Sequence, residues 1–274
     1  MKRPCIISIF ALILLFLAAG CAGSGKNDSR LAQLLASDSI PTEVKLVAKA
    51  IADGDSTAFA RQVSYPLSRP YPLRDILTEA QMRAYFPVMI DDSIRTVVVN
   101  SLPSDWAEYG WRGWALDNGR YLWIDEKIYD VTYLSAREST LRDSLIKADM
   151  ASVAPSLRKG WQPAFCLLGT ADSTLFRVDR ATAPGSPDFR LAVYRPGSPL
   201  SGVPAEIITG YSRTEGSAAV TTYCFTGASG EKLEYQSDIA DGSSPAILYT
   251  PAGDSIPRIR VEVTPAYWLD FTKQ

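Results

Sequence analysis

The chain contains 274 residues, of which 28 are Lys or Arg, 30 are Asp or Glu and none is His. Without histidine, Ser-His-Asp and Cys-His nucleophiles, His-ligated zinc or haem and a histidine general base are all excluded. A slightly acidic chain with no block of basic residues is also a poor partner for nucleic acid, which attracts clustered Lys and Arg. Any catalytic chemistry must therefore use carboxylates, Lys, Tyr or groups of the substrate.

The first segment has the pattern of an export signal. Lys2 and Arg3 precede an apolar run from Ile6 to Ala19, and Gly20 leads directly to Cys21. Small residues before a cleavage point fit a signal peptidase, and the run is shorter than the roughly 18–20 residues of a membrane-spanning helix. The segment resembles the bacterial lipoprotein signal, with one departure: Ala18 stands where a large aliphatic residue is usual.

This resemblance implies that residues 1–20 are removed and that Cys21 carries the acyl chains, palmitate among them, that anchor the protein in a membrane. In enterobacterial lipoproteins an aspartate after the lipidated cysteine retains the protein at the inner membrane. Ala22 occupies that position, which favours the outer membrane of a Gram-negative cell envelope, with the periplasmic and surface faces both open. Residues 21–30 are small and polar, which predicts a flexible tether.

Residues 31–135 are predicted to form helices followed by strands. Val44, Val47, Ala48 and Ile51 recur at helical spacing after Pro41, and a short helix is predicted from Ser56 to Gln62. Thr78 and Gln81 form a capping box that starts another helix, which Pro87 should stop or kink. The β-branched run from Arg95 to Asn100 predicts a strand. Asn118-Gly119 predicts a hairpin between residues 110–117 and 120–125, and a further strand is predicted from Ile128 to Leu134.

Part of this pattern resembles the nuclear-transport-factor-2-like cone fold. The resemblance is carried by Phe59 to Leu67 (Phe-x-x-x-Val-x-Tyr-Pro-Leu), the helix from Thr78 and the hairpin from Gly113 to Ile124, and it covers roughly residues 31–134. It implies helices packed on a curved antiparallel sheet around a conical pocket. Different members of that fold use the pocket for small-molecule chemistry or for protein contact.

The second half of the sequence predicts a long helix followed by strands alone. Residues 136–158 predict a connecting helix, in which the pairs Glu138 with Arg142 and Asp143 with Lys147 should lie on a solvated face. Residues 159–274 predict an all-β sandwich or barrel, and they resemble the β domains of uncharacterised envelope lipoproteins. The expected strands are Ala164–Leu168, Leu175–Asp179, Phe189–Tyr194, Glu206–Thr209, Ala218–Phe225, Lys232–Gln236, Ala246–Tyr249 and Ile259–Val263. The predicted fold class is therefore α+β.

The candidate site is a set of aromatic residues with two polar neighbours. Its members are Tyr65, Tyr85, Trp106, Trp111, Arg112, Trp114, Asp117, Tyr121 and Trp123. They can line a ligand pocket, fill a core or form an exposed docking patch for a protein or a glycan.

The remaining candidate groups are cysteines and acids. Because an exported protein meets an oxidising compartment, Cys166 and Cys224 either form a disulfide or are two buried free thiols on separate strands. Asp91-Asp92 is interpreted as a helix boundary. Asp238, Asp241 and Ser243 lack the spacing of a calcium loop, and the sequence predicts neither a metal nor a cofactor.

Two function classes follow from these features. The preferred one is a lipid-anchored cell-envelope binding or interaction protein without catalytic activity, with the membrane as one partner and a protein, a glycan or a small molecule as the other. The alternative is a carboxylate-based enzyme, an isomerase or a glycan hydrolase, that uses the pocket of the cone. A buried carboxylate beside the tryptophans, with a raised pKa and a route to solvent, would favour the enzyme.

Overall fold

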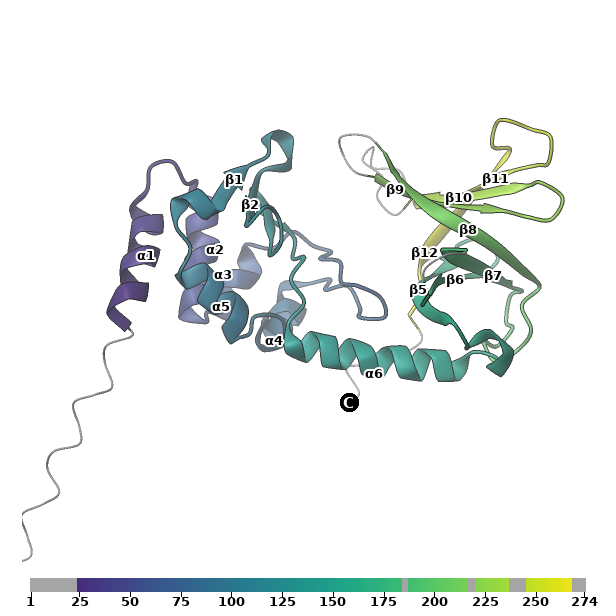
Figure 1. Cartoon of the computed structure of the whole chain (residues 1–274), viewed down its shortest axis with the longest axis horizontal. Coiled ribbons are helices and arrows are strands. Elements are labelled where there is room, and N and C mark those ends of the chain that lie inside the picture. The colour runs from purple at the N-terminus through teal and green to yellow at the C-terminus, as the bar shows by residue number, and fades with distance from the viewer. Residues whose placement is uncertain (1–23, 184–186, 216–219, 237–244, 268–274) are drawn as a thin grey trace, which may run out of the picture. The chain divides into compact units, whose positions relative to one another are not determined.

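The computed structural model describes residues 24–183, 187–215, 220–236 and 245–267 (Figure 1). By its contacts the chain divides into two compact units, residues 1–68 with 75–138 and residues 69–74 with 139–274. The predicted signal and Cys21 lie outside the described residues. In the part that is described, no helix combines the length and the apolar character that crossing a membrane requires.

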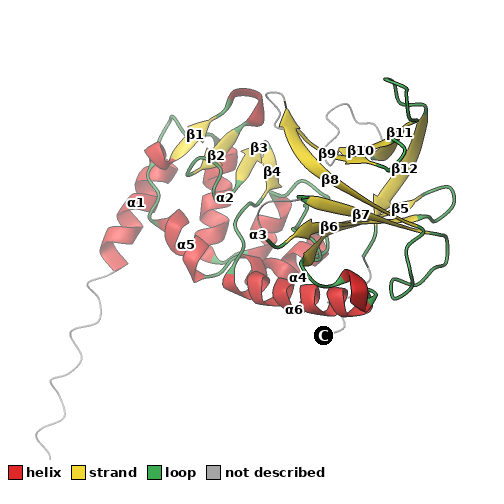
Figure 2. Ribbon diagram, turned by 45° about the vertical axis from the view of Figure 1, so that its right-hand side comes forward, coloured by secondary structure: helices red, strands yellow, loops and turns green. Residues whose placement is uncertain are grey.

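The first unit contains most of the helices and a small sheet (Figure 2). Its helices are α1 (Ser24–Ala36), α2 (Thr42–Asp53), α3 (Ser56–Arg61), α4 (Glu79–Met89) and α5 (Asp92–Val99), and its antiparallel sheet is formed by β1 (Trp106–Glu108), β2 (Trp114–Leu116), β3 (Trp123–Asp125) and β4 (Lys127–Asp130). Helix α6 (Ala136–Ser152) starts in this unit and continues into the second. The second unit contains the barrel strands β5 to β12.

Helices α3, α4 and α5 of the first unit begin after residues whose side chains cap them. Asp55 accepts hydrogen bonds from the N–H groups of Thr57 and Ala58 at 3.0 and 2.9 Å, and α3 follows it. At α4, Thr78 accepts from the N–H of Gln81 at 3.2 Å, which confirms the predicted cap. The Gln81 side chain accepts from the N–H of Leu77 at 2.7 Å rather than from Thr78. Helix α4 ends two residues after Pro87, at Met89.

The predictions for two helical segments of this unit differ from the structure. Helix α1 begins at Ser24, so residues 24–30 of the predicted tether are helical. The strand prediction for Arg95 to Asn100 is wrong, because these residues belong to α5 and to its C-terminal cap. Helix α5 buries Ile94 and Val98 on one face, and Asp91 caps its first turn. The cap and this packing outweigh the modest preference of β-branched residues for strands.

Asp91 connects three segments of the first unit. Its carboxylate accepts from the N–H groups of Ser93 and Ile94 at 3.0 and 3.2 Å, from the Tyr133 hydroxyl at 2.9 and 3.0 Å and from the N–H of Ala136 at 3.3 Å. Burial raises the pKa of Asp91, but the hydrogen bond from Tyr133 and those from the backbone outweigh burial and hold the pKa below its usual value.

We expect Asp91→Ala to lower the free energy of unfolding of the first unit by about 1–2 kcal/mol, the typical cost of losing a helix cap. Because the folded-state pKa is below the unfolded value, the stabilisation by Asp91 is present above the unfolded pKa and is lost as the pH falls through the folded pKa. Urea denaturation between pH 7 and pH 3 should show a smaller loss of stability on acidification for Asp91→Asn than for the parent. Parallel curves would contradict this assignment.

The predicted hairpin around Asn118-Gly119 is observed, but its strands are shorter than expected, because Gly110–Arg112 is a turn of 3₁₀ helix and residues 120–122 precede β3. The strand expected from Ile128 to Leu134 ends at Asp130. Strands β2 and β3 flank it, with Ala115 opposite Trp123, and the residues of the turn, Asp117, Asn118 and Gly119, have φ values of 50°, 53° and 80°. Strand β1 pairs with β2, so that Ala107 lies opposite Ala115. Strand β4 follows β3 after a turn of one residue and pairs with it. The sheet is attached to the helices through a bridge between Val63 and Ile128.

The second unit contains a closed antiparallel barrel of eight strands. Each strand pairs with the next along the chain, and the last pairs with the first, through Val263 opposite Gly169. The prediction of an all-β fold is thus confirmed and narrowed to a barrel. The strands are β5 (Trp161–Gly169), β6 (Leu175–Ala181), β7 (Phe189–Tyr194), β8 (Glu206–Glu215), β9 (Val220–Thr226), β10 (Lys232–Gln236), β11 (Ala246–Thr250) and β12 (Ile259–Pro265).

Side chains of the barrel strands fill its interior. Leu167, Phe176, Val178, Leu191 and Phe225 are among the buried residues of this core. A barrel of eight strands is just wide enough for side chains to fill or for one small ligand. Here a cavity of about 10 Å³ remains, which is at the lower limit for one water molecule. The interior of the barrel is therefore a packed core.

The two cysteines are free thiols, so the disulfide between Cys166 and Cys224 is not formed in this structure. Cys166 alternates with the core residue Leu167 on β5, and Cys224 alternates with the core residue Phe225 on β9, so both thiols point away from the barrel interior. In the ring of eight strands, β5 and β9 are diametrically opposite. A disulfide requires Cα atoms less than about 7 Å apart, which this placement does not allow.

A buried network of charged side chains holds α6 against the outside of the barrel. Arg177 on β6 donates to Asp149 on α6 at 2.5 Å and to Asp179 at 2.8 Å, and all three side chains are fully buried. Arg190 on β7 donates to the other oxygen of Asp179 at 2.6 Å. Tyr71 donates to Asp149 at 2.8 Å, so the segment 69–74 is attached to this network. Two arginines and two aspartates balance each other in formal charge.

The first acid–base pair of helix α6, Glu138 with Arg142, does not lie on a solvated face as predicted. Glu138 is fully buried rather than solvated. It accepts from the N–H of Ser135 at 3.3 Å, while Ser135 Oγ accepts from the N–H of Glu138 at 3.0 Å. This is a reciprocal capping box. Arg142 donates to the Tyr71 carbonyl at 2.9 Å, and burial lowers the pKa of its guanidinium. The pair therefore has structural partners instead of solvent.

Candidate functional site

Four aromatic side chains, three exposed and one half-buried, lie on the small sheet of the first unit and on the turn that packs against it. We call Tyr109, Trp111, Trp123 and Tyr129 the aromatic platform. The exposed fractions of Trp111, Tyr129 and Tyr109 are 67%, 41% and 37%, and Trp123 is half-buried. Exposed aromatic residues of this size are costly to keep in water, so a cluster of them indicates a contact surface.

The backbone of the sheet positions Trp123 at the centre of the platform. Trp123 lies on the same face as Ala115, which is directly opposite it, and as Ala107 on the next strand. These two small residues leave room above the sheet. Gly119 has a φ of 80°, and a Cβ atom there would meet the Trp123 ring at 2.3 Å. The indole therefore lies on the glycine of the hairpin turn, where no other residue fits.

Hydrogen bonds and ring contacts fix the orientation of the platform. The Tyr109 hydroxyl donates to the side-chain oxygen of Asn118 at 2.7 Å, and the Tyr129 hydroxyl donates to the Arg112 carbonyl at 3.0 Å. The Trp123 ring centroid lies 5.2 Å from that of Tyr109 and 6.5 Å from that of Tyr129. Burial, followed by the charge of Asp130, raises the pKa of Tyr129. Both hydroxyls are thus used to hold the rings.

Trp111 and Arg112 lie beside this group in a short turn of 3₁₀ helix, Gly110–Arg112, between β1 and β2. The guanidinium of Arg112 lies 5.3 Å from the centre of the Trp111 ring, within the range of a cation–π contact. The turn packs against β3. The platform therefore combines apolar ring faces with one cation and with the Asn118 amide.

Other predicted site residues lie elsewhere in the first unit. Trp106 is buried and donates from its indole nitrogen to Ser101 at 3.1 Å. Tyr85 is buried in the core. Tyr65 donates to the Ala60 carbonyl at 2.8 Å, and burial, then Glu79, raises its pKa to about 12 against the opposing effect of Arg83. These three are structural residues.

The last three predicted residues flank the platform without joining its rings. Trp114 is half-buried and pairs with Ile124, so it lies on the sheet face opposite to that of Trp123. Tyr121 is half-buried against Tyr133, with ring centroids 5.8 Å apart. Asp117 is an exposed residue of the hairpin turn, with a φ of 50°. Of the nine predicted residues, Trp111 and Arg112 lie on the turn that packs against β3, the strand that carries Trp123.

Sequence reasoning missed Tyr109 and Tyr129. Tyr129 follows the buried Ile128 on a strand, and alternation along a strand places it on the other face, exposed to solvent. Tyr109 follows β1, a strand of three residues that was not predicted. The alternation around Ile128 was thus the one signal that could have identified a member of the platform.

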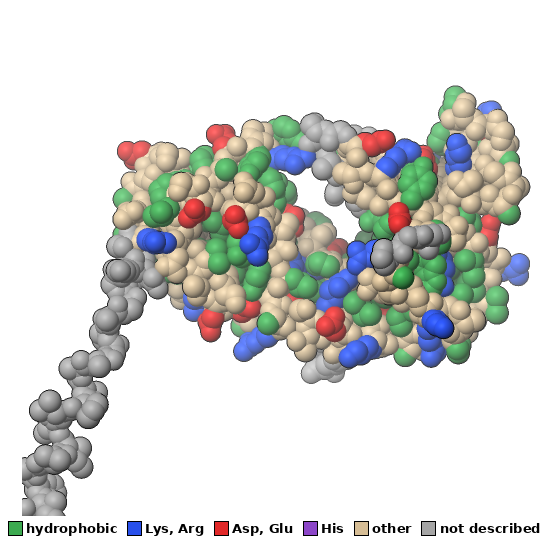
Figure 3. Space-filling view, viewed as in Figure 1, with side chains coloured by type: hydrophobic (Ala, Val, Ile, Leu, Met, Phe, Trp, Pro, Cys, Tyr) green, Lys and Arg blue, Asp and Glu red, His purple; other side chains and the backbone are tan. Residues whose placement is uncertain are grey.

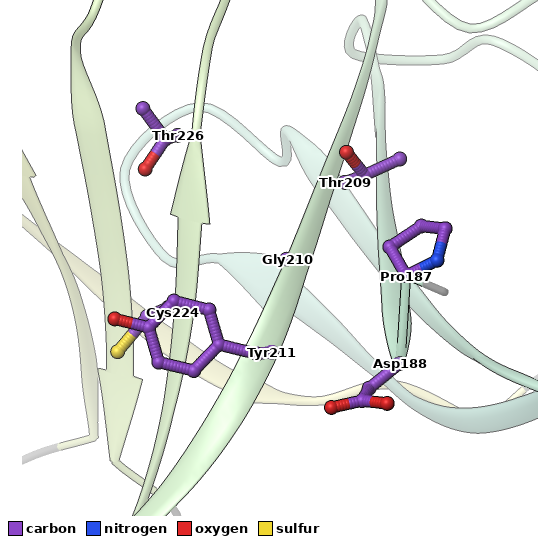
Figure 4. Close-up of a pocket in the computed structure, with 7 residues that line it drawn as sticks. All are labelled: Pro187, Asp188, Thr209, Gly210, Tyr211, Cys224 and Thr226. Carbon is purple, nitrogen blue, oxygen red and sulfur yellow. The ribbon is translucent and has the colours of Figure 1, made fainter. Parts of the chain in front are cut away.

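The barrel carries a separate open groove of about 520 Å³ on its outer wall, shown in Figure 4. Tyr211 on β8 lies opposite Cys224 on β9, and its side chain extends toward the cysteine (Figure 4). Burial raises the pKa of the Cys224 thiol, with Arg213 acting in the opposite direction. Asp188 is the charged residue of the lining. We assign no ligand to this groove.

Asp91 is a half-buried acid of the first unit. Its pKa is lowered, whereas the enzyme alternative expects a raised one, and its carboxylate accepts hydrogen bonds from three backbone groups and Tyr133. Among the described residues, no three His, Cys, Asp or Glu side chains form a potential metal site. The calcium candidates Asp238, Asp241 and Ser243 lie outside the described residues.

Comparisons with known protein families, with curated proteins and with solved structures found no match. The class of this protein is therefore defined by its architecture, a helical unit with a small aromatic sheet and an eight-stranded barrel.

Proposed function

We propose that this protein is a lipid-anchored, non-catalytic binding protein of the bacterial cell envelope, and that the aromatic platform contacts its ligand. The observation that carries the proposal is the exposure of Trp111, at 67%, within a group of rings whose hydroxyls and neighbours hold them in place. Aromatic side chains of this kind dominate the energy of binding surfaces, because their large apolar faces are released from water on contact.

The anchor belongs to the same proposal and is supported by the sequence around Cys21. Lys2, Arg3, the apolar run and the small residues before the cysteine fit a lipoprotein signal. The proposed location is the outer membrane of a Gram-negative envelope. A cone-like arrangement of the helices over the sheet is also proposed. The bridge from Val63 to Ile128 supports it, although the strands of the sheet have only three or four residues.

Site-specific photocrosslinking in intact cells tests this function. Trp111→p-benzoylphenylalanine keeps an aromatic ring on the platform, and Val203→p-benzoylphenylalanine is the matched control, because Val203 is 88% exposed on the second unit. We expect an adduct from position 111 and none from position 203. A Cys21→Ser version should move from the membrane to the soluble fraction and should lose labelling by an alkyne-palmitate analogue. Absence of an adduct at position 111 would reject the binding role.

A further inference from the structure

The aromatic platform is smaller than a surface for stable protein binding. If a fully exposed aromatic side chain presents roughly 150–250 Å², the exposed fractions of 67%, 41% and 37% correspond to about 300 Å² on Trp111, Tyr129 and Tyr109 together, and the half-buried Trp123 adds only a part of one ring. A specific protein–protein interface buries about 800 Å² on each partner. An area of about 300 Å² matches one or two six-membered sugar rings, whose axial C–H groups form a flat apolar face of similar size.

The charges around the platform argue against an anionic lipid surface or a phosphate-rich molecule as its ligand. Residues 106–130 contain five acidic and three basic side chains, which gives a net charge of −2. The visible face of the first unit carries acidic, basic and hydrophobic side chains side by side (Figure 3). An anionic lipid surface or a phosphate-rich ligand would be attracted by clustered Lys and Arg, which this segment lacks. The surroundings favour a ligand without negative charge.

The hydrogen-bonding groups beside the rings complete the match to a sugar. A neutral glycan presents hydroxyl groups around the edge of each ring, and these need donors and acceptors next to an apolar face. The platform provides the Asn118 amide beside Tyr109 and the Arg112 guanidinium beside Trp111. The two tyrosine hydroxyls are already used to fix the rings, so little side-chain freedom is lost on binding.

We infer that the aromatic platform binds an uncharged glycan chain by stacking sugar rings on Trp111 and Trp123. This inference rests on the proposed binding function and names its ligand class. Gly119 contributes by letting the Trp123 indole lie flat over the hairpin turn, since a Cβ atom at Gly119 would meet that ring at 2.3 Å. Gly119 is thus a positioning residue, and Trp111 and Trp123 are the contact residues.

Calorimetry and tryptophan fluorescence test the inference on the full chain, purified in a polyoxyethylene detergent that carries no sugar headgroup. The neutral probes are cellohexaose, xylohexaose, mannohexaose and hexa-N-acetylchitohexaose, and the acidic probe is hexagalacturonate. We expect saturable binding of at least one neutral probe and none of the acidic probe. Trp111→Ala and Trp123→Ala should each weaken binding by about tenfold or more, as for hot-spot aromatics. Trp111→Ala leaves the fold intact, because the ring is mostly exposed.

Two further variants separate stacking from other causes. Gly119→Ala should also weaken binding about tenfold and shift the emission of Trp123, although it removes no contact atom. Tyr211→Ala is the matched control, because Tyr211 is 51% exposed on the barrel, and it should bind like the parent. Binding that Trp111→Ala leaves unchanged, equal binding of the acidic probe, or no binding of any neutral probe would overturn the inference.

The failure of this inference and the failure of the proposed function give different results. A protein adduct at position 111 in cells, with no binding of any oligosaccharide, would leave the binding function standing and overturn the glycan as ligand. Tight binding of the platform to vesicles of neutral phosphatidylcholine would overturn the glycan as ligand and would identify a lipid surface instead. No adduct and no oligosaccharide binding would reject both proposals.

Discussion

Asp179→Ala is expected to lower the free energy of unfolding of the barrel unit by about 3–5 kcal/mol, the range measured when one partner of a buried ion pair is removed. The Asp179 carboxylate is fully buried and is shared by Arg177 and Arg190, at 2.8 and 2.6 Å. Its removal leaves two buried guanidinium groups against the single carboxylate of Asp149. A buried charge without a partner is costly because the surrounding protein solvates it far less well than water does.

Hydrogen exchange of the β6 and β7 amides, followed by mass spectrometry in increasing urea, measures this loss without interference from the first unit. Asp254→Ala is the matched control. Asp254 pairs with Arg258 at 2.9 Å on the surface, with the two side chains 35% and 66% exposed, and exposed pairs contribute at most about 1 kcal/mol. Similar losses for the two variants would show that the buried network does not support the barrel.

Gly113→Ala is expected to cause the second-largest loss of stability. The loss falls on the small sheet that carries the aromatic platform. Gly113 has φ 71° and ψ −142°, a region of backbone conformation that is essentially restricted to glycine and costs other residues about 1–3 kcal/mol. A Cβ atom there would also lie 2.1 Å from the Ile124 carbonyl oxygen. Because that neighbour is backbone, it cannot rotate away. The variant should therefore separate the Gly110–Arg112 turn from β3.

The near-UV circular dichroism of the tryptophans and the urea midpoint of the first unit report this change. Gly110→Ala provides a close control three residues away. Gly110 also has a positive φ, at 59°, but nothing lies within 4 Å of its Cβ position. Gly110→Ala should therefore cost only about 1 kcal/mol, the left-handed backbone penalty. Equal effects at the two glycines would mean that the close approach to Ile124 is not important for the sheet.

The positions of the barrel strands were accessible to sequence reasoning because their signals are local. Each of the eight expected runs in residues 159–274 overlaps one observed strand. Alternation of core and outward residues, as at Leu167 and Cys166, and turn residues between the runs both act over a few positions. Closure into a barrel depends instead on the pairing of β12 with β5, which no local pattern specifies, so a sandwich and a barrel were equally compatible with the sequence.

Features that depend on distant residues escaped prediction. Arg177 and Asp179 alternate along β6 like two solvent-facing residues, and only the placement of α6 over them makes them buried. The run from Arg95 to Asn100 has β-branched residues typical of strands, but the Asp91 cap and the buried Ile94 and Val98 make it helical. For the platform, the sequence identified Trp111 and Trp123, while neither Tyr109 nor Tyr129 was recognised.

The pairing of β12 with β5 also determines how late in synthesis the barrel can close. The strands that close the ring begin at Trp161 and end at Pro265, so both edges of the unfinished sheet stay unpaired until β12 has been synthesised. Unpaired edges are where strands join other chains, and contacts between distant residues form late in folding. Pairing of β12 with β5 therefore removes the two exposed edges through which unfinished chains can aggregate. Truncations within β12 would leave these edges exposed for longer.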